Sequence, residues 1–446
     1  MNSAYPFPDT GVRRGGWTLV AVSLGGMMVG LDGTALTIAG PEIARSTGSS
    51  LADLQWITNA YLLALAVFLF PAGRFADRFG RRRLFLAGVL GFGLVSLLIA
   101  FTSTTGPLIA LRAAQGLCGA MLQPAALALL RVAFPPHRLE LALGIWGGAA
   151  AASIAAGPIV AGLLVQRFGW QAVFAVNVPI SVLTVLLTLA TVTESRVRGV
   201  QGRTRDLLRA PGVVIGATLT MLSYFSLFGI LFFLTLYLQN VRGLDPIGAG
   251  VWLLPVTVVV VLSAPLGGAL TARFGPRLPA AGGLALIATG LLGFTRLDAT
   301  TGWTSALPAS IVLGLGTGIA LIASTQVIIS GAPVAMSALA SALQQVATQV
   351  GGVLGIVVLG AVMSWRAGYF VADESVTQGT VPPGVSPADA HLAFLAGFAA
   401  TAVAAAAVVG AGAVIALRVR SGRAGAQPAG PPERTSDVDS ERRHQQ

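Results

Sequence analysis

The chain has 446 residues, of which 54% are hydrophobic and only 10% charged, and its mean hydropathy of +0.79 excludes a soluble globular protein. The formal charge of +11 comes from 28 basic residues, all of them arginine, so the chain lacks the lysine that a phosphate-binding ATPase loop requires. A single cysteine excludes a disulfide framework within the chain. The three histidines lie in loops or the tail, so the sequence predicts no metal site and no enzyme chemistry.

Twelve apolar stretches are long enough to cross a membrane as helices, since about 20 residues span a ~30 Å hydrocarbon layer. They are continuous rather than alternating, which favours helices over the strands of a barrel. The predicted spans are 17–40, 54–74, 84–102, 107–130, 141–165, 171–193, 212–238, 248–271, 279–296, 305–330, 337–363 and 392–417. The first is interpreted as a retained span, with a twin-arginine export signal as the alternative.

The arginines follow the positive-inside rule. With the N-terminus in the cytoplasm, the opposite side holds Arg45, Arg167, Arg242, Arg296 and Arg366. Arg112 falls inside a span, which leaves 22 of the 28 on the cytoplasmic side. The pattern predicts a multi-pass protein of the cell membrane with both termini in the cytoplasm, and it explains the basic charge without nucleic acid.

The first span carries Asp32, the only acid within any predicted span. A carboxyl group in the hydrocarbon layer costs about 2.5–3.5 kcal/mol on insertion scales, so it is normally kept there for function. Low dielectric favours its neutral form and a nearby cation favours its charged form, so a carboxyl between these effects can bind and release a proton. The alternative is a helix-end aspartate at the membrane interface, because the predicted span ends near residue 40.

The loop GRFADRFGRRR, residues 73–83, concentrates six charges between the second and third spans. Its arginines hold the loop in the cytoplasm, and Asp77 is placed to pair with basic groups or a helix N-terminus of the other half of the protein. We expect this contact to latch the cytoplasmic side shut. The candidate gating residues are Gly73, Asp77, Arg78, Gly80, Arg81 and Arg82.

The fourth and fifth spans carry two further candidates. Arg112 lies early in the fourth span with Gln115 one turn on, where the alternative is an arginine that extends its charge to the outer interface. The fifth span has small residues at intervals of four and three, which lets another helix approach closely, and a proline that permits a bend. Its small residues are Gly144, Gly148, Ala151, Ala155, Pro158 and Gly162. The alternative there is ordinary tight packing in a static bundle.

An internal repeat divides the chain. GRFADRFGRR at 73–82 aligns with GALTARFGPR at 268–277, and both copies lie between the second and third spans of a six-span half. The arrangement predicts an N-terminal half at 1–193, a basic cytoplasmic connector at 194–211 and a C-terminal half at 212–417. The tail, 418–446, has too little apolar content to fold and is expected to be disordered in the cytoplasm.

Two six-helix halves with this loop motif resemble the major facilitator superfamily, and several stretches are similar to its fourteen-span drug:proton antiporters. These stretches are LDGTALTIAGPEI (31–43), LQWITNAYLLALAVFLFPAGRFADRFGRRR (54–83), LRAAQGLCGAMLQPA (111–125), GAAAASIAAGPIVAG (148–162), LYLQNVRGLDPIGAGVWLLP (236–255) and ALQQVATQVGGVLG (342–355). Two features depart from that family: the connector leaves no room for its two extra central helices, and Thr37 replaces its usual asparagine.

The resemblance implies twelve helices in two pseudo-symmetric halves, with a substrate site near the midplane. It makes the first and fourth helices neighbours, so that Asp32 can meet Arg112 directly or through Gln115. It implies a gating role for the 73–83 loop, and an export role for the fifth-span motif with Gly148, Gly157, Pro158 and Gly162.

The expected function is a secondary transporter that exports lipophilic drugs, antibiotics or related metabolites in exchange for protons. We expect no cofactor beyond the proton as coupling ion, a small lipophilic substrate and the lipid bilayer as partners, and a monomer. Candidate substrate-binding residues are Asn59, Tyr61, Gln123, Phe228, Tyr237 and Gln344. The alternatives are a proton-coupled uptake symporter and a membrane sensor or scaffold that does not transport.

Overall fold

The structure, a computed structural model, describes residues 10–194, 209–332 and 336–418. Within these ranges the chain is helical and contains no strand. The elements are α1 (Thr10–Thr47), α2 (Leu51–Phe79), α3 (Arg81–Ala100), α4 (Thr105–Ala133), α5 (Pro136–Phe168), α6 (Gln171–Ala175), α7 (Asn177–Thr191), α9 (Pro211–Leu236), the π-helix η1 (Tyr237–Val241), α10 (Pro246–Phe274), α11 (Arg277–Gly293), η2 (Phe294–Arg296), α12 (Trp303–Gly331), α13 (Ser337–Gly368), η4 (Glu374–Gln378) and α14 (Pro387–Ala416).

Local sequence explains where several helices begin. Ser50 and Asp53 form a capping box at the start of α2, and Asp245 accepts a hydrogen bond from the first turn of α10. Proline occupies the first turn of α9, α10 and α14, where its missing N–H costs no hydrogen bond. The starts of α2, α9, α10 and α14 are therefore set by residues that favour a helix start.

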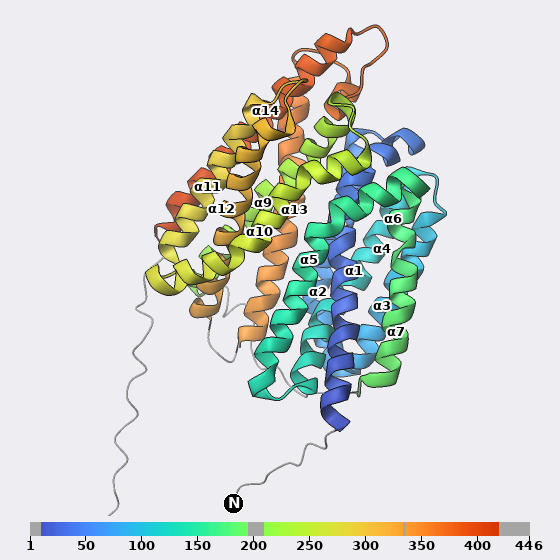
Figure 1. The fold of residues 1–446 in the computed structure, drawn as a ribbon, viewed down its shortest axis with the longest axis vertical. Helices are drawn as coiled ribbons and strands as arrows, with labels where there is room; N and C mark the ends of the chain where they lie inside the picture. Colours follow the sequence, from blue (N-terminus) through green and yellow to red (C-terminus); the bar gives the residue numbers. More distant parts are fainter. Residues whose placement is uncertain (1–9, 195–208, 333–335, 419–446) are drawn as a thin grey trace, which may run out of the picture.

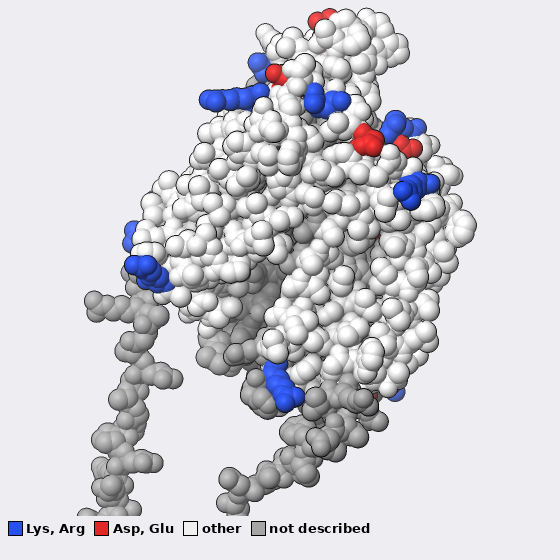
Figure 2. Space-filling model, viewed as in Figure 1, with Lys and Arg blue, Asp and Glu red and all other residues white. Residues whose placement is uncertain are grey.

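The prediction of twelve membrane-spanning helices is confirmed. Eleven helical segments in the described chain are long and apolar enough to cross a membrane, and the bent α5 makes the twelfth. The short α6 and the longer α7 together form the sixth span, Gln171–Thr191. On the face seen in Figure 2, charged side chains lie towards the two ends and a broad uncharged band separates them, as expected of a chain embedded in a bilayer.

The helices pack in two halves with the same arrangement (Figure 1). In the first half α4 packs against α2 and α3, and α1 packs against α5; in the second, α12 packs against α10 and α11, and α9 against α13. The halves meet through α5 with α10 and through α2 with α13, which occupy equivalent positions. The packing confirms the pseudo-symmetry that the repeat predicted. Most of the connector (195–208) and almost all of the tail (419–446) lie outside the described residues.

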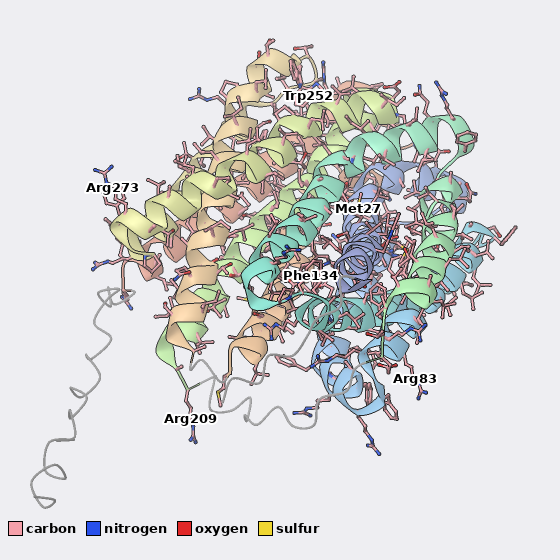
Figure 3. The ribbon with its side chains drawn as sticks, turned by 60° about the horizontal axis from the view of Figure 1, so that its bottom comes forward. Met27, Arg83, Phe134, Arg209, Trp252 and Arg273 are labelled. Atoms are coloured by element: carbon pink, nitrogen blue, oxygen red, sulfur yellow. The ribbon has the colours of Figure 1, made fainter. Side chains whose placement is uncertain are left out.

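Two ends of the bundle can be distinguished. We call the end where α1 begins and α14 finishes the terminal end, and the opposite end, where α1 finishes at Thr47, the distal end. Viewed from the terminal end in Figure 3, Arg83, Arg209 and Arg273 lie at the periphery of the molecule. The distal end carries the loop between α13 and α14, in which Val376 of η4 is fully buried and packs on the neighbouring helices.

Candidate functional site

The centre of the first half contains a buried ion pair. Arg112 Nη1 on α4 donates a hydrogen bond to Asp32 Oδ2 on α1 at 2.5 Å, and the two side chains are only 1% and 0% exposed. A second guanidinium nitrogen, Nε, donates to the carbonyl oxygen of Ile57 on α2 at 3.2 Å. Because α1 continues to Thr47, Asp32 lies well inside this helix, and Arg112 is bound to Asp32 instead of extending to the protein surface.

Gln115 joins the pair, one turn after Arg112. Its Oε1 accepts a hydrogen bond from Arg112 Nη1 at 2.5 Å, and its Nε2 donates to Asp32 Oδ1 at 3.1 Å. The structure therefore brings together the three residues that the sequence grouped, both directly and through the glutamine. Their role in proton coupling remains a prediction.

Two further polar residues, which the sequence analysis did not name, complete this cluster. Ser96 on α3 accepts a hydrogen bond from Gln115 Nε2 at 2.8 Å, and Asn177 at the start of α7 lies 3.4 Å from Asp32 Oδ1. Both side chains are fully buried. An available signal was the amide of Asn177 inside a predicted span, two residues before Pro179.

Aromatic rings enclose the guanidinium. The centre of the Tyr61 ring lies 4.3 Å from the Arg112 guanidinium carbon, and the Phe174 ring lies 5.6 Å from it. Both distances suit a cation–π interaction. Tyr61 is thus packed inside the first half, where it also contacts Phe92 edge-on, and the charged cluster is shielded on these sides from water and lipid.

At the distal end the two halves are in close contact. A Cβ placed on Gly162 of α5 would lie 2.5 Å from the carbonyl oxygen of Pro246 of α10, and one placed on Gly250 would lie 2.5 Å from that of Pro158. Hydrogen bonds join the same end, from Gln166 to Asp245 at 2.9 Å and from Gln239 of η1 to the Ile38 carbonyl at 2.8 Å. Only glycine permits these backbone approaches.

Towards the terminal end the same small-residue face lies open. A Cβ placed on Gly144 or Gly148 of α5 would meet nothing within 4 Å, and the same holds for Gly268 of α10. The break in α5 between Ile154 and Ala156, with an angle of 44°, precedes Pro158, as the loss of a backbone donor allows. The described helices are therefore sealed distally and separated at the terminal end of α5 and α10.

The 73–83 loop is bound to its own half. Arg82 N and Arg83 N donate to the carboxylate of Glu194 at 3.1 and 3.3 Å, and Arg82 Nη2 donates to the Leu189 carbonyl at 2.9 Å. Arg81 Nη1 lies 3.4 Å from the Ala128 carbonyl of α4. The remaining gating candidates lie on or beside α2: a Cβ placed on Gly73 would meet nothing within 4 Å, Arg78 lies over the Phe79 ring, and Gly80 has a φ of 108°. The side chain of Asp77 lies outside the described part, so its predicted latch has no structural test.

The candidate substrate residues lie in different places. Gln345 of α13 donates to Gln123 of α4, a contact between the halves, and Phe228 of α9 lies close to Gly352 of α13, where Leu62 of α2 also approaches. The buried Oδ1 of Asn59 has no hydrogen-bond partner in the described chain.

Gln344 and Tyr237 instead contact their own half. The first donates to Thr325 at 2.5 Å, and the second stacks on Phe398 while its hydroxyl donates to the Asp298 carbonyl at 2.6 Å. Gln123 and Phe228 therefore lie where the two halves meet, where a substrate between the halves could contact them.

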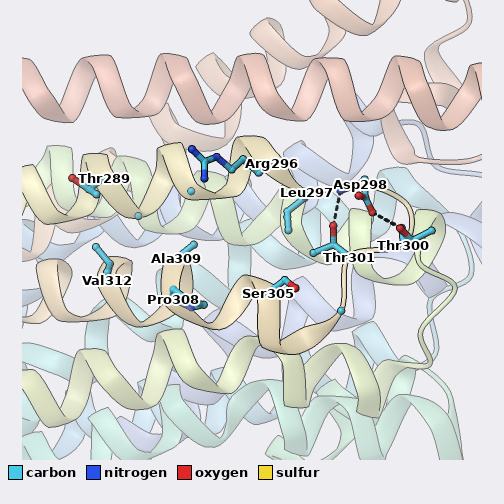
Figure 4. A pocket seen from close by; sticks show the side chains of 13 residues that line it. Thr289, Arg296, Leu297, Asp298, Thr300, Thr301, Ser305, Pro308, Ala309 and Val312 are labelled. Atoms are coloured by element: carbon cyan, nitrogen blue, oxygen red, sulfur yellow. Dashed lines mark hydrogen bonds between the residues drawn. The ribbon is translucent and has the colours of Figure 1, made fainter.

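A cavity of about 700 Å³ lies away from this cluster, at the distal ends of α11 and α12 (Figure 4). Its rim carries Arg296 and Asp298, and hydrogen bonds from Thr300 and Thr301 hold the pKa of Asp298 below its usual range. It does not adjoin the ion pair. Groups of three or more possible metal ligands are absent from the described residues.

Comparison with known proteins places these features in a family context. A sequence model of the Major Facilitator Superfamily matches residues 22–356. The tetracenomycin C resistance and export protein of Streptomyces glaucescens is 39% identical over 427 residues, covering 82% of this chain and 79% of that protein. The multidrug efflux pump LfrA of Mycolicibacterium smegmatis is 31% identical over 425 residues, covering 82% and 84%.

Solved structures support the fold. A bacterial homologue of the human lysosomal transporter Spinster, in an inward-facing and unoccupied conformation, matches with a TM-score of 0.77 over 91% of this chain and 96% of that one. The sequences are 19% identical, so this likeness concerns the fold alone.

A further sequence relative is the methyl viologen resistance protein SmvA of Salmonella typhimurium, which is 31% identical over 407 residues, covering 78% of this chain and 82% of that protein.

Proposed function

Because this chain belongs to the Major Facilitator Superfamily, we propose that it is a proton-coupled antiporter that exports lipophilic drugs, antibiotics or related metabolites by alternating access. The resistance and export proteins among its relatives support this direction of transport. The observation that carries the proposal is the buried Asp32–Arg112 pair, because a carboxyl group beside a cation inside the membrane can be either ionised and paired with that cation or protonated and released from it. We propose no covalent chemistry and no cofactor other than the proton.

The proposed topology assigns the terminal end to the cytoplasm. The loops at that end hold most of the arginines, as the positive-inside rule requires, so both chain termini would be cytoplasmic in the cell membrane. The state described above is then open to the cytoplasm and closed to the outside. A substrate would enter between the halves, near Gln123 and Phe228, and one copy of the chain would suffice.

A transport cycle follows from this geometry. In the inward-open state Asp32 is ionised and bound to Arg112, as expected after release of a proton to the cytoplasm. In the outward-open state a proton from outside would neutralise Asp32 and weaken its hold on Arg112. The ion pair thus makes the protonation state of Asp32 differ between the two conformations. Coupling of proton movement to substrate transport requires such a difference.

Everted membrane vesicles that contain the protein test this proposal. We expect a lipophilic fluorescent dye to accumulate inside them when a pH gradient, acidic inside, is imposed, and to leak out when an uncoupler removes the gradient. Loss of dye from the vesicles on acidification would instead indicate an uptake symporter. A gradient-independent distribution equal to that of empty vesicles would indicate a protein that does not transport.

The single carboxylate predicts a preference in substrate charge. Asp32 is the only acid within the predicted spans, so a dication would lack a second carboxylate to balance its charge in the site. We expect efflux of the dication methyl viologen to be at least about ten-fold slower than that of the monocation ethidium, measured in the same vesicles. Equal rates for the two compounds would contradict the single-acid site.

The latch assigned to Asp77 gives another prediction. Asp77→Asn should leave expression and membrane insertion unchanged but lower dye efflux by about ten-fold or more, because it removes a charge from the gate and not from the core. Glu42→Gln is a suitable control, since Glu42 forms only an exposed ion pair with Arg45 on its own helix. Normal efflux by a well-expressed Asp77→Asn protein would discard the gate.

A further inference from the structure

The sixth span passes beside the ion pair. α6 ends at Ala175 and α7 begins with Asn177, while Val176 between them keeps helical dihedral angles (φ −60°, ψ −25°), so Asn177 lies within the continuous span Gln171–Thr191. Asn177 Nδ2 lies 3.4 Å from Asp32 Oδ1 and 3.4 Å from Ser96 Oγ. Its Oδ1 is buried and has no hydrogen-bond partner among the described residues. A buried amide with an unsatisfied oxygen is costly, so a reason for its presence is expected.

Ser96 fixes the orientation of two amides. Its hydroxyl oxygen accepts from Gln115 Nε2 at 2.8 Å and from Asn177 Nδ2, which uses both acceptor positions of the oxygen. Gln115 cannot turn over, because its own oxygen accepts from Arg112. Both amides therefore direct N–H groups at the same carboxylate oxygen of Asp32.

The same short segment contacts the cation. Phe174, three residues before Asn177, presents its ring to the Arg112 guanidinium at 5.6 Å. Residues 174–177 thus contact both members of the ion pair, one through an aromatic ring and the other through an amide.

Few other groups act on this carboxylate. Among the described residues, the charged or titratable side chains that face Asp32 are Arg112 from α4 and Tyr61 from α2. The remaining helices packed on α1 are α5, α6, α7, α9 and α10, and their arginines and carboxylates lie only near helix ends. Tyr224 of α9 interacts with Thr348 instead.

We propose that Asn177, held by Ser96, is a positioning residue that favours the ionised form of Asp32 and directs its carboxylate at Arg112 in the proton-released state. This inference rests on the proposed proton coupling through Asp32. An N–H group that donates to a carboxylate stabilises the charged form more than the neutral acid. Removing that donor makes Asp32 hold its proton more tightly, so that release requires a higher pH.

The test is the pH dependence of dye transport in proteoliposomes, with the pH varied on the side that the terminal end faces. Asn177→Leu removes the amide while it keeps the branched shape and the number of side-chain heavy atoms. It should raise the pH of half-maximal transport by about one unit, because one hydrogen bond to a charged group is lost. Asn177→Gln keeps an N–H₂ group and should restore part of the wild-type profile. Ser96→Ala should shift the profile in the same direction by a smaller amount.

Thr184→Val is the matched control. Thr184 is also fully buried on α7, but its hydroxyl donates only to the Ile180 carbonyl of its own helix at 2.7 Å. We expect no shift for this variant. A folded Asn177→Leu protein with the wild-type pH midpoint would overturn the inference, and if that variant does not fold, an unshifted Ser96→Ala protein would do so. Wild-type protein without pH-dependent transport would instead refute the proposed function.

Discussion

Asp32→Asn is expected to abolish uphill export of a lipophilic dye while exchange down a concentration gradient persists. One proton that moves inward across ~100 mV gains about 2.3 kcal/mol. At about 1.4 kcal/mol per ten-fold ratio this sustains roughly a fifty-fold gradient of a neutral substrate. An asparagine cannot carry the proton, so the ratio measured in energised vesicles should fall to about one.

The substitution also leaves Arg112 buried without a counter-ion, which can cost about 3–5 kcal/mol of stability. Asp32→Asn combined with Arg112→Gln removes both charges and should restore the thermal stability of the purified protein without restoring uphill efflux. Glu42→Gln again serves as the control for loss of an acid. If either Asp32 variant still pumps against a gradient, the coupling proton binds elsewhere and the ion pair is structural.

The fold was largely predictable because a lipid bilayer restricts which secondary structures can cross it. Continuous apolar stretches must form helices in lipid, and all twelve predicted spans correspond to helices or bent helices of the structure. The internal repeat predicted the equivalent packing of the two halves. Helix ends were less predictable: α1 extends to Thr47, past the predicted limit near residue 40, because Pro41 lies within the helix instead of ending it.

The ion pair was predictable in part. A charge inside a span needs a partner, and Asp32 and Arg112 were the available pair, although their adjacency came from a family resemblance and not from spacing. Ser96 and Asn177 were not predicted, because a serine or asparagine in an apolar span is equally compatible with local bonding to its own helix. Their meeting depends on the packing of α7 against α1 and α3, which the spacing within one span does not show.

The substrate candidates show the same limit. Tyr61 and Tyr237 were chosen as aromatic residues in spans, but an apolar span does not show which face of a helix points towards the other half. The structure places Tyr61 against Arg112 and Tyr237 against Phe398. By contrast, the small-residue face of α5 was recognisable from its spacing alone. The spacing did not show that only the distal part of this face contacts α10.

The contact between α5 and α10 at the distal end leads to a second prediction of a large loss of transport. We expect Gly162→Ala, and equally Gly250→Ala, to lower dye efflux by about ten-fold or more. The added methyl would lie 2.5 Å from a backbone oxygen of the facing helix, so α5 and α10 must move apart where the molecule is now sealed. Overpacking of this kind costs about 1–3 kcal/mol, which shifts a two-state equilibrium about 5- to 150-fold. Alanine is the better helix former, so the loss cannot come from α5 or α10 itself.

A thiol-labelling experiment reports that shift directly. In a Cys118→Ser background, a cysteine introduced at Gly144, where the structure leaves open space, should react with a membrane-impermeant reagent added on the side of the terminal end. Gly162→Ala should slow this reaction, because destabilising the distal seal favours the state in which the terminal end is closed. Gly282→Ala on α11, where an added Cβ meets nothing within 4 Å, should change neither labelling nor efflux. Unchanged labelling in the Gly162→Ala protein would mean that the contact between α5 and α10 persists through the cycle, and the small-residue face would then be static packing.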